Sequence, residues 1–278
     1  YKTYEEEEIF DKEFIYNLTM DQKRAINDIN DDLTSGVPMD RLLCGDVGFG
    51  KTEVALRAMF KAVLNNYQVI YLCPTTILSK QQYNVALKRF NSWPITIKLY
   101  NRFTTKKEET QILQGAEKGT IDIIFGTHKL LNEKLKMKKL GLLIIDEEQR
   151  FGVKHKEKIK ELKNDINVLT LSATPIPRTL KMALSGLRNL SIIETAPSNR
   201  YPVQTYVASE DELLVKDAIY KEISRDGQIF ILYNNIANLE QKVYEINKLV
   251  PEAQCRFAHG QMDKDDLDDI MEDFTLHK

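Results

Sequence analysis

The chain has 278 residues, of which 42% are hydrophobic and 29% charged, and its formal net charge is -2. This composition excludes an intrinsically disordered protein, and the length favours two domains of roughly 100 to 200 residues each. No apolar run reaches the roughly 18 to 20 residues of a membrane span, and the acidic start does not resemble a signal peptide, so we expect a cytoplasmic protein without a membrane partner. The near-neutral charge gives no general argument for a nucleic-acid partner, which must be argued from motifs.

Apolar segments of strand length alternate with longer helical patterns in the first two thirds of the chain. The strand candidates are 42–45, 69–73, 121–126, 140–146 and 168–172. Their near-continuous hydrophobicity predicts strands that are covered on both faces. The stretches between them carry apolar residues at intervals of three and four, as amphipathic helices do. The pattern predicts an α/β fold with a doubly wound parallel sheet.

Prolines, Ser and Asn interrupt this pattern at 194–203, where we place the domain boundary. We divide the chain into a lead-in segment, a first domain and a second domain, at 1–16, 17–196 and 197–278. The second domain is predicted to alternate three strands with three helices, at 204–208, 210–225, 228–233, 239–249, 254–258 and 264–274. Such sheets usually hold about five or six strands, so we expect this domain to be truncated.

The segment 45–52, GDVGFGKT, fits the phosphate-loop pattern G-x-x-x-x-G-K-[ST] and lies between a predicted strand and a predicted helix. Glycines let the backbone amides face phosphate oxygens, and the helix presents its positive N-terminal end to the anion. We expect Lys51 to neutralise the β and γ phosphates of ATP, and Thr52 to bind Mg²⁺. The nucleotide-binding residues of the loop are Gly45, Asp46, Val47, Gly48, Phe49, Gly50, Lys51 and Thr52.

Carboxylates end the apolar segment 140–146, at the edge of the sheet where ligands bind in open α/β folds. Asp146 is expected to hold Mg²⁺, and Glu147 to orient and deprotonate the attacking water. A charged cluster at a strand end is often only a solvated turn, and the phosphate loop is what favours catalysis here. The three cysteines and four histidines are too far apart for a disulfide framework or a tetrahedral metal site, so any metal is expected to arrive with the nucleotide.

Small hydroxyl residues follow three other predicted strands, in PTT (74–76), GTHK (126–129) and SAT (172–174). The SAT hydroxyls could hydrogen-bond to the carboxylate site, and the other two offer groups that grip phosphates without reading bases. Each segment by itself is more typical of a helix cap than of a binding site.

In this order, the phosphate loop, PTT, GTH, DEEQ and SAT resemble the motifs of the superfamily 2 helicases and translocases, whose motor domains are RecA-like. Within that superfamily, 39–58, 126–131, 141–157 and 171–186 are similar to the bacterial transcription-repair coupling factors, the Mfd family. The resemblance implies a RecA-like domain followed by a partial second one. It also implies ATP-driven movement on double-stranded DNA, displacement of stalled RNA polymerase and recruitment of the excision-repair protein UvrA. RecG-type fork-remodelling translocases share several of these elements and are the alternative family.

The resemblance also implies roles for individual residues. Gln22 in LTMDQ would read the adenine edge, with Phe14 packed on the base. Gln149, Ser172 and Thr174 would couple the nucleotide state to the grip on DNA, and Gln149 would complete the catalytic set with Lys51, Asp146 and Glu147. Contacts with the DNA backbone are implied for Thr75, Arg102, Thr127, His128 and Arg178.

The family pattern continues past AHGQM (258–262) to an arginine-bearing motif that this sequence does not contain. Because an arginine supplied across a cleft is worth roughly 10³ to 10⁵ in rate, we expect the isolated chain to bind nucleotide and hydrolyse it slowly. Two other classes stay open: a nucleotide-dependent binding module without motor activity, and an RNA helicase. The sequence lacks the guanine-reading NKxD, and DEEQ in place of DEAD weakens the RNA helicase hypothesis. Stimulation of ATP hydrolysis by duplex DNA discriminates among them.

Overall fold

The computed structural model describes residues 1–162, 166–173, 188–198 and 203–277. The chain forms two compact units, Tyr1–Tyr201 and Pro202–Lys278. The lead-in segment packs within the first unit, because Phe10 is buried in the same core as the helices that follow it. Among the described residues, no helix is both long enough and apolar enough to cross a bilayer.

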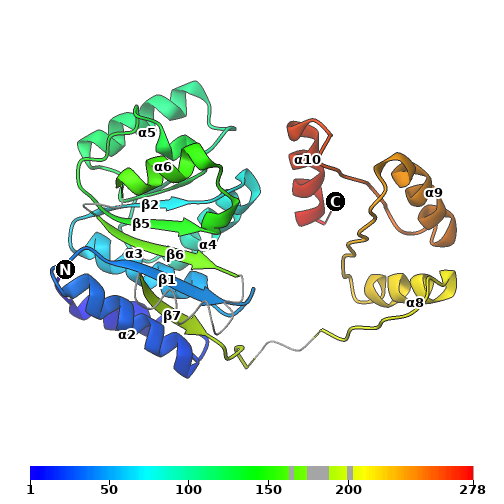
Figure 1. Ribbon diagram of the computed structural model, residues 1–278, viewed down its shortest axis with the longest axis horizontal. Coiled ribbons are helices and arrows are strands. Elements are labelled where there is room, and N and C mark those ends of the chain that lie inside the picture. Colours follow the sequence, from blue (N-terminus) through cyan, green and yellow to red (C-terminus); the bar gives the residue numbers. More distant parts are fainter. Residues whose placement is uncertain (163–165, 174–187, 199–202, 278) are drawn as a thin grey trace. The chain divides into compact units, whose positions relative to one another are not determined.

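A seven-stranded sheet organises the first unit, in the order β3-β4-β2-β5-β6-β1-β7 (Figure 1). All its neighbouring strands pair in parallel. The strands are β1 (Asp40–Gly45), β2 (Gln68–Leu72), β3 (Ile97–Tyr100), β4 (Ile123–Gly126), β5 (Leu140–Asp146), β6 (Asn167–Ser172) and β7 (Asn189–Ile193). This confirms the doubly wound parallel sheet and the five predicted strands. It adds β3 and β7, which were not predicted.

Helices cover both faces of the sheet (Figure 1). One core includes side chains of α1 (Glu5–Lys12), α2 (Met20–Thr34), α3 (Lys51–Leu64) and α4 (Thr76–Arg89). The other includes side chains of α5 (Lys106–Lys118) and α6 (Val153–Leu162). Alternate residues of β5 enter the two cores, since Leu142 and Ile144 belong to the first and Leu143 and Ile145 to the second. This double burial explains the continuous apolar pattern of the central strands.

Three of these helices, α2, α4 and α5, have a threonine as their N-cap residue. The side chains of Thr19, Thr75 and Thr105 each accept a hydrogen bond from the backbone amide three residues later, at 3.2, 3.2 and 3.3 Å. Each cap satisfies an amide that has no partner within its helix. The SAT hydroxyls were considered for the same role, but their segment is described only as far as Ala173.

The second unit contains three α-helices within its described residues: α8 (Glu212–Ile223), α9 (Leu239–Leu249) and α10 (Lys264–Thr275). The prediction of these helices is confirmed. The prediction of strands at 204–208, 228–233 and 254–258 is wrong, because none of these described segments forms a strand. Apolar and β-branched residues favour a strand only where it can pair and bury them, and here Val207, Phe230 and Leu232 are largely exposed.

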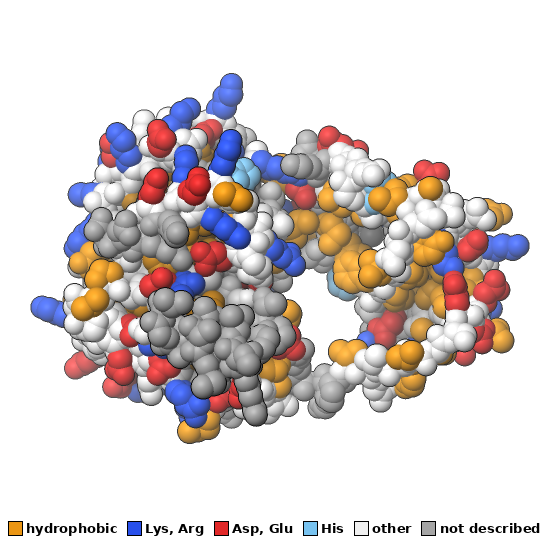
Figure 2. All heavy atoms as spheres, in the orientation of Figure 1, with side chains coloured by type: hydrophobic (Ala, Val, Ile, Leu, Met, Phe, Trp, Pro, Cys, Tyr) orange, Lys and Arg blue, Asp and Glu red, His pale blue; other side chains and the backbone are white. Residues whose placement is uncertain are grey.

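A small apolar cluster holds the second unit together. Its buried members are Ile219, Ile246 and Val250. Figure 2 shows other hydrophobic side chains gathered on the surface of this unit. The extensive cores that position a site therefore lie in the first unit.

Candidate nucleotide-binding site

The predicted phosphate loop joins the end of β1 to the start of α3. Gly48 and Gly50 have φ angles of 80° and 83°, in the left-handed region that favours glycine. Gly50 is the residue that caps α3. The amide of Phe49 donates to the carbonyl of Asp46 at 3.2 Å, which closes a tight turn inside the loop. Gly48 and Gly50 thus lie where the backbone of the loop favours glycine.

Lys51 is the first residue of α3, and its side chain folds back over the loop. Its Nζ donates to the carbonyl oxygens of Gly45 at 2.6 Å and Asp46 at 3.0 Å. Burial lowers the pKa of Lys51, against the opposing effect of the negative charges of Asp146 and Glu147. The charges of both predicted catalytic carboxylates therefore act on an ammonium group whose hydrogen bonds go to the loop carbonyls.

Gln22 braces the same loop from α2. Its Nε2 donates to the carbonyl of Phe49 at 2.7 Å, and its Oε1 accepts from the amide of Thr19 at 2.9 Å. A Cβ atom on Gly50 would lie 2.4 Å from that Nε2, so any side chain at position 50 would displace the amide group of Gln22 from its present place. The predicted adenine-reading residue is thus buried and bonded to the phosphate loop, a contact that the sequence pattern did not reveal.

Asp146 lies at the carboxyl end of β5 and is largely buried. Burial, and then the charge of Glu147, raise its pKa to about 6, while Lys51 acts in the opposite direction. The hydroxyl of Tyr71 donates to Oδ2 of Asp146 at 3.4 Å. Tyr71 is fully buried and stacks on Phe125 with 4.8 Å between the ring centroids. The sequence does not indicate a role for Tyr71, since a tyrosine in a buried strand is usually only a core residue.

Glu147 occupies a left-handed backbone conformation, with φ of 51°. For a residue other than glycine this conformation costs roughly 1 to 2 kcal/mol, so surrounding bonds must hold it. Its amide donates to the carbonyl of Leu171 at 2.9 Å, and its carboxylate accepts from the amide of Ala173 at 2.8 Å and from the side-chain amide of Gln149. The DEEQ turn is therefore tied to the end of β6, beside the buried Ser172.

The donor chemistry of the site fits Mg²⁺. Asp146 offers carboxylate oxygens and Thr52, in the first turn of α3, offers a hydroxyl, and Mg²⁺ prefers such hard oxygen ligands together with substrate phosphates. Among the described residues, no group of three His, Cys, Asp or Glu side chains could hold a metal ion. The protein's share of such a site is thus one carboxylate and one hydroxyl.

Four residues predicted to contact DNA follow the carboxyl ends of neighbouring strands. Thr75 follows β2, Arg102 follows β3, and Thr127 and His128 follow β4. Because these strands are parallel neighbours, the four residues belong to one edge of the sheet. Thr75 and His128 are exposed, whereas Thr127 is buried. The His128 ring stacks on that of His155, with centroids 4.9 Å apart.

Of three other residues with predicted roles, the structure describes only Phe14. The ring of Phe14 faces two guanidinium groups, those of Arg57 and Arg89, each 5.7 Å from its centroid. Thr174 and Arg178 lie outside the described residues.

Comparison with known proteins identifies the family to which this chain is similar. Residues 19–183 match the family described as DEAD/DEAH box helicase. The chain is 51% identical over 98% of its length to a transcription-repair-coupling factor of Staphylococcus epidermidis, and 52% identical over 97% to one of Staphylococcus aureus. It spans 23% of the length of each of these relatives. A structure of RecG bound to a three-way DNA junction aligns with a TM-score of 0.82 and 34% identity, covering 98% of this chain and 36% of that chain.

Proposed function

The chain belongs to the DEAD/DEAH box helicase family, and from that premise we propose that it is the ATP-binding part of a transcription-repair coupling motor that moves along double-stranded DNA. The observation that carries the proposal is that the phosphate loop with Lys51 follows β1 while Asp146 and Glu147 end β5, so that the charges of both carboxylates act on the loop lysine at the carboxyl edge of one parallel sheet. Its relatives support the choice of DNA, since the RecG structure is that of a DNA complex.

Each residue of the site has a distinct part in hydrolysis. The ammonium of Lys51 leaves its two carbonyl partners and neutralises the β and γ phosphates, and Glu147 orients the attacking water. Thr52 and Asp146 would hold Mg²⁺, which when bound neutralises charge on the phosphates. Gln22 reads the adenine edge, and its bond to Phe49 links that contact to the phosphate loop.

The bond between Glu147 and the amide of Ala173 provides a route from hydrolysis to movement. Loss of the γ phosphate changes what Glu147 contacts, and Ala173 lies between the coupling residues Ser172 and Thr174. We place the DNA backbone along Thr75, Arg102, Thr127, His128 and Arg178. In the whole protein, this motor would push RNA polymerase from a lesion and recruit UvrA.

The test measures steady-state ATP hydrolysis under three conditions: without nucleic acid, with duplex DNA added, and with single-stranded RNA added. Duplex DNA is expected to raise the rate more than RNA does, and Lys51→Ala is expected to lower it at least about 100-fold, because the phosphates lose their cation. DNA-stimulated hydrolysis that survives Lys51→Ala contradicts the proposed site. Greater stimulation by RNA contradicts the proposed track.

A RecG-type fork-remodelling activity is the second candidate, favoured by the similarity to the RecG structure. The two activities differ in the preferred DNA. Three-way junctions that stimulate hydrolysis more strongly than a linear duplex of equal length would favour the RecG type.

A further inference from the structure

Arg188 lies just before β7 and reaches across one face of the sheet. Its Nη1 is 3.4 Å from the carboxylate of Glu148, in the DEEQ turn. Its Nη2 contacts both the carboxylate of Asp40 on β1 and the hydroxyl of Thr170 on β6. One guanidinium group therefore connects the catalytic turn to two central strands.

The two ion pairs of Arg188 differ in how far their carboxylates are buried. The side chains of Arg188 and Glu148 are 16% and 26% exposed, whereas that of Asp40 is 48% exposed. Water screens the ion pair with the half-exposed Asp40, which is the shorter of the two, more strongly than it screens the ion pair with Glu148. Thr170 supports the contact between Arg188 and Glu148, because its hydroxyl also donates to the Glu148 carboxylate at 3.5 Å.

Glu148 directly follows Glu147, whose left-handed backbone needs support. The bonds from Glu147 to Leu171 and Ala173 hold the turn on one side. The carboxylate of Glu148 fastens it on the other, through Arg188. Removing that fastening leaves the turn with fewer bonds to oppose its backbone strain.

We propose that Arg188 is a positioning residue for Glu147 and acts through Glu148, an assignment that rests on the proposed ATP hydrolysis. Arginine suits this position because its planar group presents five donors in a fixed fork and can serve three acceptors on separate elements. A lysine is a single point charge on a flexible stem and cannot serve all three. Arg188 itself makes no contact with the nucleotide in this mechanism.

The chain offers a matched control in Arg41, which follows Asp40 on β1 and therefore lies on the opposite face of the sheet. Arg41 is also largely buried, and it donates to Asp32 at 2.6 Å and to Ser191 at 2.8 Å. Arg41→Gln thus removes a buried, hydrogen-bonded arginine that joins β1 to β7, while the bonds of Glu148 to Arg188 and Thr170 stay in place.

The first measurement is amide hydrogen exchange in the intact chain, which requires no turnover. In Arg188→Gln the amides of Glu147 and Ala173 are expected to exchange at least about tenfold faster, because their bonds open more often. In Arg41→Gln these two amides are expected to keep the wild-type rate. Unchanged exchange in Arg188→Gln overturns the proposal, and so does equal acceleration in Arg41→Gln, which would indicate general loosening of the sheet.

The second measurement is DNA-stimulated ATP hydrolysis. Arg188→Gln is expected to lower kcat about tenfold with KM for ATP nearly unchanged, because it displaces the water-orienting group and leaves the phosphate loop intact. Arg188→Lys should recover part of the loss, and Arg188→Gln combined with Glu148→Gln should be no worse than either alone. Additive losses, or a rise in KM alone, contradict the assignment. A wild-type chain that hydrolyses no ATP defeats the proposed function, and the exchange rates then decide the role of Arg188.

Discussion

At the scale of a single residue, the proposed Mg²⁺ ligand Asp146 is a buried carboxylate whose charged form is unfavourable. In the folded chain its pKa is raised from 3.8 to about 6, chiefly by burial and then by Glu147. The folded state therefore holds a proton over a pH range in which the unfolded state has released it. The resulting stabilisation is complete below pH 3.8 and is lost as the pH rises through 6. The difference corresponds to about 3 kcal/mol.

Replacing Asp146 by its neutral isostere should therefore stabilise the chain in a pH-dependent way. Without nucleotide or Mg²⁺, Asp146→Asn is expected to raise the free energy of unfolding by about 2 to 3 kcal/mol at pH 7.5, and by much less at pH 4. Urea unfolding at the two pH values measures this. The exposed Asp31→Asn serves as the control and should show no such trend. A gain of equal size at both pH values would refute the explanation.

Two glycines allow the phosphate loop to be tested as an element. Gly50 and Gly36 share the left-handed conformation, with φ of 83° and 81°. A Cβ on Gly50 meets Gln22 at 2.4 Å, whereas one on Gly36 meets nothing within 4 Å. Both substitutions by alanine should cost roughly 1 to 2 kcal/mol from backbone strain. Only Gly50→Ala also displaces the side-chain amide of Gln22 that bonds to the loop.

Titration with a fluorescent ATP analogue separates these effects. Gly50→Ala is expected to weaken binding at least about tenfold, because the loop amides lose their arrangement, whereas Gly36→Ala should bind like the wild type. Equal affinities in the two variants would show that the contact with Gln22 is dispensable.

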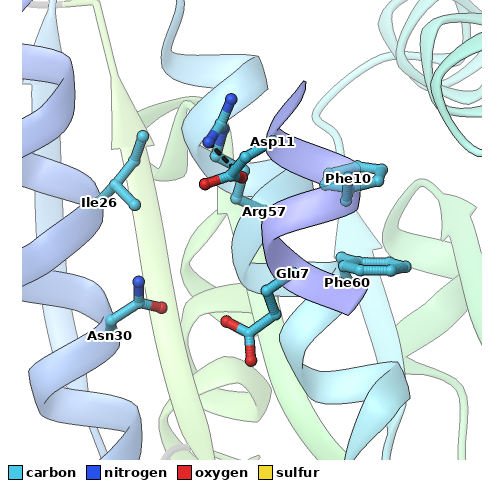
Figure 3. A pocket seen from close by; sticks show the side chains of 7 residues that line it. All are labelled: Glu7, Phe10, Asp11, Ile26, Asn30, Arg57 and Phe60. Carbon is cyan, nitrogen blue, oxygen red and sulfur yellow. Dashed lines mark ion pairs between the residues drawn. The ribbon is translucent and has the colours of Figure 1, made fainter. Parts of the chain in front are cut away.

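Helix α1 is anchored on α3, the helix that starts at the phosphate loop. Figure 3 shows Glu7, Phe10 and Asp11 of α1 beside Arg57 and Phe60 of α3. Phe10 stacks on Phe60 with 4.2 Å between the ring centroids, and Asp11 forms an ion pair with Arg57. The lead-in segment thus forms part of the first unit's core.

The ion pair between Glu7 and Lys61 provides a stability test for this anchor. Lys61 is only 1% exposed, and its Nζ lies 3.0 Å from Glu7. Glu7→Ala is expected to lower the free energy of unfolding by about 2 to 4 kcal/mol, because it leaves a buried ammonium group without its carboxylate. The neighbouring Glu8→Ala is the control, since Glu8 pairs with Lys12 on the exposed face and should cost under about 0.5 kcal/mol. Urea unfolding of the two variants that gave equal losses would contradict this account.

The same elements show how far the sequence predicts the structure. The central strands were found because burial on both faces makes them continuously apolar, and the loop and DEEQ turn because their spacing follows from phosphate chemistry. The short edge strands β3 and β7 carry a weaker pattern, as in NLSII, where polar and apolar residues mix. Contacts such as Gln22 with Phe49 and Arg188 with Glu148 join residues distant in sequence, and no local pattern indicates them.

The two units of the molecule differ in the apolar surface that they bury. The first has a core on each face of its sheet, and the second has a cluster centred on Ile219, Ile246 and Val250. Because stability follows buried apolar area, α8 and α9 are expected to exchange their amide hydrogens faster than α3 and β5. Hydrogen exchange on the whole chain measures this. Equal protection throughout would contradict the difference in stability.

In the proposed motor, ATP at this site controls the grip on duplex DNA. The most direct test of this control is the affinity of Glu147→Gln for duplex DNA with saturating ATP and with saturating ADP, since this variant should bind ATP without hydrolysing it. We predict affinities that differ at least about fivefold, and by reciprocity an equal effect of DNA on the preference for ATP over ADP. Equal affinities in the two nucleotide states would contradict a motor and leave only a nucleotide-binding module.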